Sequence, residues 1–161
     1  MGGPVSITKA KSKRKGAKNT ITSGVYAKAR INFPLIYGEF VRNLGKNTGS
    51  VLSFLGVARL ESADGSMEIK SLLIESYEKH ANSVLQNICK EVQEKYSLTD
   101  ILIVHGRGKF SAGEPVVMVL VASPRRKLGF EALRDAVERY KKEPALFKKE
   151  IYKDGSSAWI S

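Results

Sequence analysis

The sequence predicts an α+β domain, because two segments have helical periodicity and four others have the composition of strands. Apolar residues recur at three- and four-residue steps in the two helical segments, 77–96 and 125–142. Runs rich in aliphatic and β-branched residues cover 50–58, 67–76, 100–104 and 115–122. With 161 residues, the chain is long enough for one hydrophobic core. We therefore expect one domain with a mixed or antiparallel sheet and two main helices.

The N-terminal segment carries most of the net charge of +11. Eight Lys or Arg residues and no acidic residue precede Glu39. Because a block of one charge sign resists compaction, we expect a flexible basic arm at 1–24 and a folded domain at 25–161. Such an arm could be a solubilising extension or could bind nucleic acid without sequence specificity. A nucleic-acid-binding protein is therefore one alternative to the function given below, and an inactive member of the family named there is the other; we favour neither.

Several protein classes are excluded by composition. No apolar run approaches the roughly 20 residues that a membrane span needs. The first residues lack the apolar core of a secretory signal, so we expect a cytoplasmic protein. Cys89 is the single cysteine, which excludes an internal disulfide or a cysteine zinc site. It lies beside the apolar face of its helix, so we interpret it as a small buried hydrophobe, not as a reactive thiol.

The first half of the domain is expected to begin with a strand, a turn and a short helix over 25–43. Gly56 lies inside the strand 50–58, where it would permit close approach of a neighbouring group. The turn signal Ala-Asp-Gly at 63–65 separates this strand from the strand 67–76. We therefore expect the two strands to pair as a hairpin.

The segments 100–104 and 115–122 are expected to be central strands joined by 105–114. The Gly-Arg-Gly of that connection fits neither a dinucleotide fingerprint nor a phosphate-binding Walker loop. The two histidines, His80 and His105, do not form a metal-binding cluster. We interpret His80 as a surface residue and His105 as structural more often than catalytic.

The helix 125–142 carries two cations that need an explanation. Its predicted apolar face comprises Phe130, Leu133, Val137 and Tyr140. At about 100° per residue, Arg126 and Lys141 fall on the same face. A half-buried cation is costly unless it is paired or used, although long side chains can also reach solvent from helix ends. Arg126, beside Arg125, lies in the first turn, where anions are favoured.

Other cations lie where they could join a site. Arg59 directly follows a predicted strand and could bind a phosphate or carboxylate with its planar guanidinium. In an extended segment 145–152, Lys148 and Lys149 would point to opposite faces. A lysine kept partly dry can transfer protons or act as a nucleophile near neutral pH.

The order of several motifs resembles the large, catalytic subunit of molybdopterin synthase. They are FLGVAR (54–59), LLIESY (72–77), ILIVHGRGKFSAGE (101–114), VASPRRKLGFEALRDAVERYKKEPALFKKE (121–150) and DGSSAWI (154–160). The resemblance extends from about residue 25 to the end and leaves out the basic arm. It implies an α/β hammerhead-type fold.

The resemblance also implies a reaction, sulfur transfer in molybdenum cofactor biosynthesis. A ubiquitin-like small subunit would bring a C-terminal thiocarboxylate to cyclic pyranopterin monophosphate, and two transfers would form the dithiolene of molybdopterin. A homodimer of the large subunit with two small subunits would make a heterotetramer. We expect neither a metal nor a cofactor, because the sulfur arrives already activated.

Site residues follow from the resemblance, residue by residue. The catalytic candidates are Lys141 and Lys148, and the substrate-binding candidates are Arg59, Arg125, Arg126, Phe54 and His105. Arg125 stands where the family usually has histidine, so a neutral donor or base is lost there. Arg126 and Lys141 are 15 residues apart, or about 22 Å along a helix. We therefore expect each site to take Arg126 from the second protomer.

Overall fold

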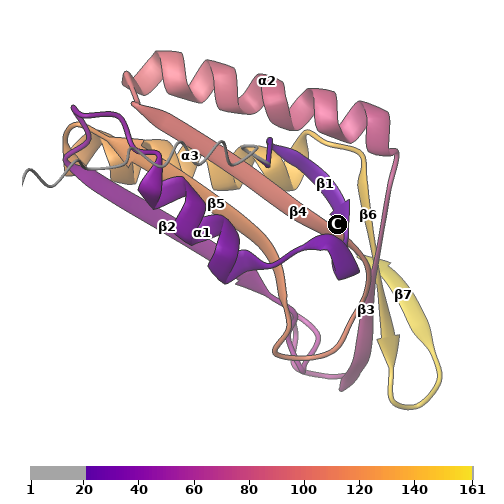
Figure 1. Ribbon diagram of the computed structural model, residues 1–161. Helices are drawn as coiled ribbons and strands as arrows, with labels where there is room; N and C mark the ends of the chain where they lie inside the picture. The colour runs from indigo at the N-terminus through magenta and orange to yellow at the C-terminus, as the bar shows by residue number, and fades with distance from the viewer. Residues whose placement is uncertain (1–20, 161) are drawn as a thin grey trace, which may run out of the picture.

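A computed structural model describes residues 21–160, and these form an α+β fold (Figure 1). The strands are β1 Gly24–Ala27, β2 Ser50–Val57, β3 Ile69–Ser76, β4 Asp100–Phe110, β5 Pro115–Ser123, β6 Leu146–Tyr152 and β7 Ser157–Ile160. The helices are the short η1 Lys28–Arg30, α1 Phe33–Arg42, α2 Glu78–Tyr96 and α3 Arg126–Lys142. The predicted fold class, with two main helices and a mixed sheet, is confirmed.

The sheet has the strand order β2-β5-β4-β3-β6-β7, and β1 adds a parallel pairing to β4. The predicted hairpin between 50–58 and 67–76 is wrong. β2 pairs along its whole length with the buried strand β5, whereas β3 pairs with β4 and β6. A turn does form near Asp64, whose carboxylate accepts hydrogen bonds from Ser62 and Ser66. It reverses the chain locally, but pairing with the distant strands buries more apolar surface.

The strand β4 is longer than the sequence predicts. It continues through His105 to Phe110, so the predicted connection 105–114 shrinks to the turn 111–114. Gly106 favours a loop in the sequence but lies inside this strand. A Cβ atom there would lie 2.7 Å from the Phe110 ring, so the glycine serves close packing inside a strand.

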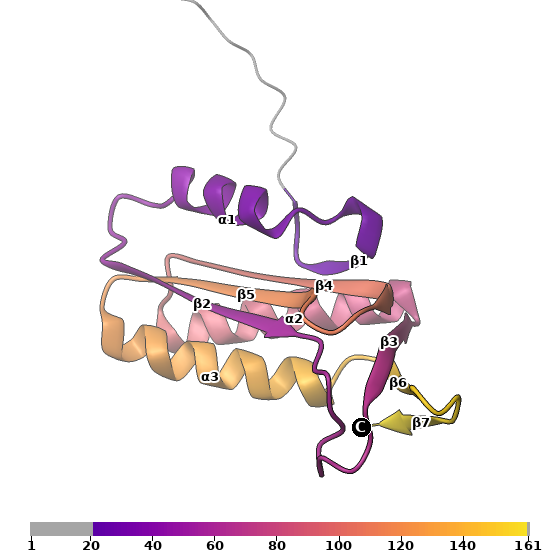
Figure 2. The ribbon, with the colours of Figure 1, turned by 90° about the horizontal axis from the view of Figure 1, so that it is seen from below.

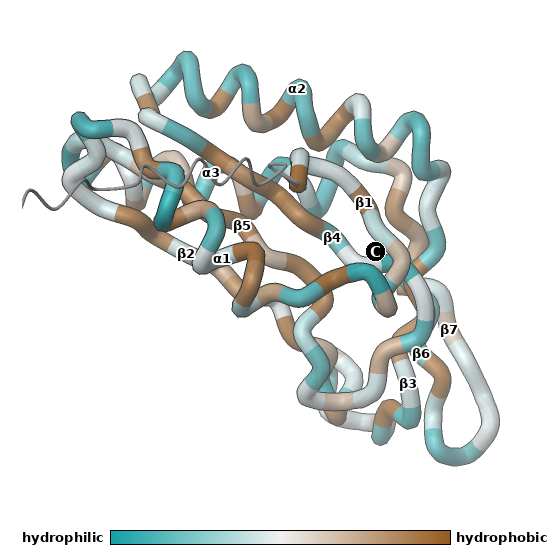
Figure 3. The backbone as a smooth tube through the Cα atoms, in the orientation of Figure 1, coloured by the Kyte–Doolittle hydropathy of each residue, from teal (hydrophilic) through white to brown (hydrophobic). Residues whose placement is uncertain are grey.

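The elements form three layers, which Figure 2 shows edge-on. Helix α1 covers one face of the sheet and helices α2 and α3 cover the other. The larger core lies between the sheet and α2 and α3, and a second cluster lies under α1. The strands β4 and β5 are apolar where the helices cover them, and α2 is hydrophilic on its outer side (Figure 3). Strands β3, β6 and β7 extend the sheet beyond the end of α3.

The buried face of α3 differs from the predicted one. The residues it buries are Gly129, Ala132, Ala136 and Tyr140. Phe130, at the centre of the predicted face, is 63% exposed. A Cβ atom on Gly129 would lie 2.6 Å from the Leu52 side chain, so small residues let the helix approach the sheet closely. Arg126 and Lys141 are therefore exposed, and the prediction that they lie on the packing face is wrong.

The predicted environments of Cys89 and His80 are confirmed. Cys89 is buried in the core, and burial raises the pKa of its thiol to about 11. His80 is exposed on α2. Within residues 21–160, no group of three His, Cys, Asp or Glu side chains could hold a metal, and none of the helices described is long and apolar enough to cross a membrane.

Residues directly before the predicted domain start at residue 25 pack against the rest of the fold. Residues 1–20 of the predicted arm 1–24 lie outside the described residues. Ser23 is buried, and its hydroxyl accepts a hydrogen bond of 3.0 Å from the backbone N–H of Ile103. Residues 21–24 therefore belong to the fold.

Candidate active site

A pocket of about 560 Å³ lies where β2, the end of α3 and β6 meet. Its lining comes from β2 and residues 58–59 after it, from β3, β5 and β7, and from the end of α3 and the following strand β6. Most of the walls are apolar, and the charged side chains among them are Arg59, Lys141, Lys148 and Glu150. The structure therefore brings together two of the predicted lysines and one predicted arginine.

Phe54 forms a wall of the pocket because of a glycine two residues later. A Cβ atom on Gly56 would lie 3.3 Å from the Phe54 ring and 2.5 Å from the Val117 side chain. Glycine thus lets the ring lie along the end of β2, and the pairing with β5 shifts register after it. The predicted role of Gly56 in close approach is confirmed. The Lys141 ammonium lies 5.9 Å from the centroid of the Phe54 ring, within cation–π range.

The two lysines converge because α3 ends between them. The helix ends at Lys142, Pro144 follows, and β6 brings Lys148 back to the pocket. Burial, and secondarily the charge of Lys141, lower the pKa of Lys148. Lys149 points to the other face of β6, where its ammonium lies 5.4 Å from the Trp159 ring centroid. Adjacent lysines therefore occupy different environments, as the strand alternation predicts.

The charges of the pocket are incompletely balanced. Among the described residues, no carboxylate lies within 4.0 Å of the cationic groups of Arg59, Lys141 or Lys148, whereas seven ion pairs form elsewhere. The buried Glu150 carboxylate accepts a hydrogen bond of 2.9 Å from the Tyr152 hydroxyl. Three cations and one carboxylate leave the pocket with a net positive charge, which favours an anionic ligand.

Behind the pocket lies His105, which was predicted to bind substrate. It is completely buried and does not line the cavity. Its Nδ1 donates to the carbonyl oxygen of Gly106 at 2.8 Å, and burial lowers its pKa from 6.5 to about 4. Its ring packs edge-on against Tyr140, with centroids 5.8 Å apart. His105 therefore supports the inner wall as a neutral imidazole.

Arg125 and Arg126, the other predicted binding residues, lie at the far end of α3. Both are exposed, and neither lines the pocket. Sequence reasoning missed Tyr140 and Glu150 as lining residues. Glu150 could have been found, because a residue two positions after Lys148 on a strand shares its face. Tyr140 was predicted to be buried but not to reach a site.

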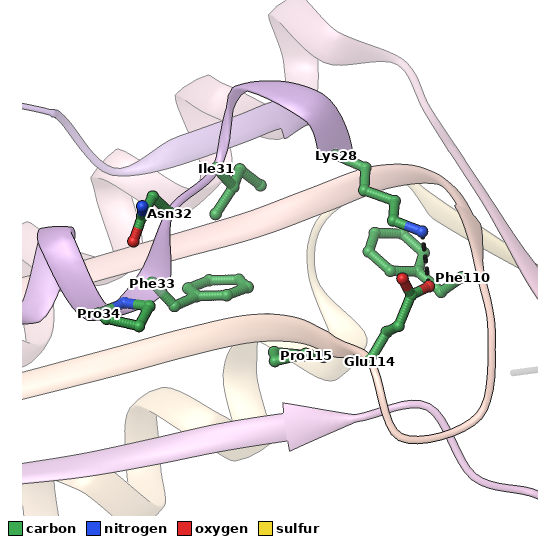
Figure 4. A pocket seen from close by; sticks show the side chains of 8 residues that line it. All are labelled: Lys28, Ile31, Asn32, Phe33, Pro34, Phe110, Glu114 and Pro115. Atoms are coloured by element: carbon green, nitrogen blue, oxygen red, sulfur yellow. Dashed lines mark hydrogen bonds and ion pairs between the residues drawn. The ribbon is translucent and has the colours of Figure 1, made fainter.

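A second cleft, of about 320 Å³, contrasts with this pocket (Figure 4). It lies between η1, the start of α1 and the β4–β5 turn, and its walls include Phe33, Phe110 and Pro115. The Lys28 ammonium lies 5.3 Å from the Phe110 ring centroid and 2.5 Å from the Glu114 carboxylate. Lys28 also donates to the Lys109 carbonyl at 3.0 Å. These mutual contacts fasten η1 to the β4–β5 turn.

Comparisons with known proteins identify relatives of the chain. The model of the family described as MoaE protein matches residues 28–143. Over 115 residues the chain is 36% identical to the molybdopterin synthase catalytic subunit of Bacillus subtilis (strain 168), with 71% of each chain covered. The fold is similar to that of molybdopterin synthase from Staphylococcus aureus, with a TM-score of 0.75 and 27% identity. The match covers 86% of this chain and 96% of that one.

A further structural likeness is to the complex of subunits 1 and 2 of molybdopterin-converting factor from Helicobacter pylori 26695. The TM-score is 0.65, and the match covers 87% of this chain and 88% of that one. At 16% identity, this likeness shows the fold alone.

Proposed function

The chain belongs to the MoaE protein family, and we propose that the pocket formed by Arg59, Lys141 and Lys148 is where it transfers sulfur. Its function is that of the large, catalytic subunit of molybdopterin synthase, an enzyme of molybdenum cofactor biosynthesis. The observation that carries the site assignment is the convergence of three cations, none of them in an ion pair among the described residues, on a pocket with apolar walls.

The proposed substrates are both anions. One is the C-terminal thiocarboxylate of a ubiquitin-like small subunit, and the other is cyclic pyranopterin monophosphate. Each transfer forms a carbon–sulfur bond on the pterin in place of a carbon–oxygen bond. Water then attacks the acyl carbon, so that the acyl–sulfur bond breaks and the small subunit leaves as a carboxylate. Two anions repel each other, so their reaction requires fixed positive charge in a site of low dielectric. The Helicobacter pylori complex, whose fold this chain shares, joins two different subunits of molybdopterin-converting factor, which is consistent with a partner subunit here.

The lysines are assigned different roles because their environments differ. Lys141 is exposed at the pocket mouth beside Phe54, where it can contact the terminal carbonyl of the incoming tail or transfer a proton. Lys148 lies deeper, and its lowered pKa suits proton donation nearer neutral pH than an ordinary lysine allows. Arg59 at the end of β2 is suited to bind the phosphate.

Arg125 and Arg126 enter the proposed site from a second protomer. They lie at the end of α3 opposite to Lys141, about 22 Å away along the helix axis, which is too far for one small pterin to span. An isologous dimer in which the two α3 helices lie antiparallel beside each other would place the N-terminal end of one α3 near the pocket of the other subunit. The homodimer would then be required for activity.

Reconstitution tests the proposed site. Purified protein, a thiocarboxylated small subunit and cyclic pyranopterin monophosphate should yield molybdopterin, measured by fluorescence of its oxidised product. Lys141→Ala should lower the rate by about 1,000-fold, because fixed charge and proton transfer are lost together. Lys142→Ala is the matched control. The Lys142 ammonium lies 3.6 Å from the Glu138 carboxylate, and Lys142 does not line the pocket. Near-normal activity of Lys141→Ala would disprove the assignment.

Subunit mixing tests the shared site. Lys141→Ala and Arg126→Ala proteins should each be inactive as homodimers. After exchange, half of the dimers are mixed and each has one intact site of two, so about a quarter of wild-type activity should return. If exchange is verified by mass spectrometry and activity does not return, both residues act within one protomer.

A further inference from the structure

Tyr140 is a polar residue of the pocket to which the roles above assign no task. It is the last large residue of the buried face of α3, directly before Lys141. Its ring lies between the Phe54 ring, at a centroid distance of 6.3 Å, and the His105 ring, at 5.8 Å. Although Tyr140 is only 2% exposed, it lines the pocket. Its orientation is therefore fixed by packing on two sides.

The Tyr140 hydroxyl has space but no partner. Among the described residues, no group forms a hydrogen bond with this hydroxyl, and burial alone raises its pKa. The fully buried side-chain atoms without a partner belong to Ser71, Ser76, His105 and Arg107. Since the Tyr140 hydroxyl is not among these atoms, it must reach solvent-accessible space. The cavity that Tyr140 lines is the pocket, so the hydroxyl is available to a ligand there.

We propose that the Tyr140 hydroxyl is a further substrate-contacting group, a neutral donor that hydrogen-bonds an anionic oxygen held between Lys141 and Lys148. The inference rests on the proposed function, because it concerns the same pocket. The phenol stays protonated at neutral pH, since burial raises its pKa to about 12. A packed tyrosine adds direction to the charge of the flexible lysines, because its oxygen can move little.

Two substrates carry suitable acceptors, the carbonyl oxygen of the thiocarboxylate and the oxygens of the cyclic phosphate. The shared chemistry is a charged acceptor in a partly dry site, where a donor is worth more than in water. Kinetics can separate the two sources, because each substrate has its own KM.

The test is Tyr140→Phe in the reconstituted enzyme, with Tyr77→Phe as the matched control. Tyr77 is 75% exposed at the start of α2 and does not line the pocket. Tyr140→Phe keeps the ring contacts to Phe54 and His105, so its thermal unfolding midpoint should equal that of the wild type. Its kcat/KM should fall about tenfold or more, because a hydrogen bond to a charged group is lost. Tyr77→Phe should change neither value.

Direct binding distinguishes failure of the inference from failure of the proposed function. A synthetic peptide ending in glycine thiocarboxylate and inorganic phosphate would each be titrated by calorimetry into wild-type and Tyr140→Phe protein. Weaker binding of one probe to the variant identifies the acceptor and supports the inference even if reconstitution fails. Wild-type kcat/KM for both substrates together with equal binding of both probes would overturn the proposed hydrogen bond. If wild-type protein binds neither probe and is inactive, both proposals are wrong.

Discussion

The active-site pocket and the Lys28 cleft each place a lysine over a phenylalanine ring, but their charges are balanced differently. Lys141 lies 5.9 Å from the Phe54 centroid, and Lys28 lies 5.3 Å from the Phe110 centroid. Lys28 is also paired with Glu114, whereas Lys141 is in no ion pair among the described residues. The cleft satisfies its own polar groups and so joins two segments of the fold. The pocket leaves its cations available to a ligand.

This difference teaches that a lysine beside an aromatic ring is not by itself a sign of a site. The informative observation is a cation in an apolar wall with no ion-pair partner. Such a cation loses hydration and forms no contact that stabilises the fold. Lys148 is the clearest case, since burial and the neighbouring Lys141 both lower its pKa. We expect such residues to lower stability and to be required for activity.

The largest effect should come from Lys148→Met, which keeps the length of the side chain and removes its charge. Activity in the reconstituted reaction should fall about 1,000-fold, as expected for loss of a group acting in proton transfer. Stability should rise by about 1 kcal/mol, because a desolvated charge that faces another cation is removed. Urea unfolding at pH 7 measures the second effect.

Lys149→Met is the control for this variant. Lys149 lies on the other face of β6 beside Trp159, so its removal should leave activity within about twofold and should not raise stability. A Lys148→Met protein that is less stable than wild type would show that the pocket cation contributes to the fold, and the contrast with Lys28 would then be lost.

A smaller effect concerns the inner wall of the pocket. The folded-state pKa of His105 is about 4, below its ordinary value of 6.5. The unfolded chain therefore binds the proton first as the pH falls, so the contribution of His105 to stability is complete above about pH 6.5 and is lost as the pH falls towards 4. Since one pKa unit corresponds to about 1.4 kcal/mol, the loss should be about 3 kcal/mol.

His105→Gln isolates this contribution, because every other titrating group is shared with the wild type. Denaturant unfolding between pH 7 and pH 4 should give a smaller decline in stability for the variant, by about 3 kcal/mol. If the stability of both proteins declined equally, His105 would be protonated in the folded state without cost, and the wall behind Tyr140 would be hydrated.

The smallest effect should come from the cleft. Lys28 and Glu114 are both about two-fifths exposed, so solvent screens their attraction and the pair should contribute little to stability. Lys28→Met should unfold at a slightly lower urea concentration and should retain full activity. A double-mutant cycle with Glu114→Gln measures the coupling. Loss of activity in Lys28→Met would show that the cleft also takes part in function.

Much of the molecule follows from the sequence. Helical periodicity over 77–96 places α2 within one residue of its observed bounds, and the alternation of a strand separates Lys148 from Lys149. These patterns depend on neighbours along the chain, and so they can be read from one segment at a time. The ordered motifs likewise point to the family before any coordinates are considered.

Tertiary structure alone decided which strands pair and which face of α3 is buried. The turn signal at 63–65 favours pairing of β2 with β3, but β2 pairs with the distant β5. Strand pairing depends on the apolar surface that two remote segments bury together. Helix α3 buries its small residues and exposes Phe130, since steric fit against Leu52 outweighs the hydropathy of one side chain. That rotation also determines where Tyr140 and Lys141 meet the pocket. Helical periodicity predicts that a helix has an apolar face, and only packing against the sheet determines which side of the helix is buried.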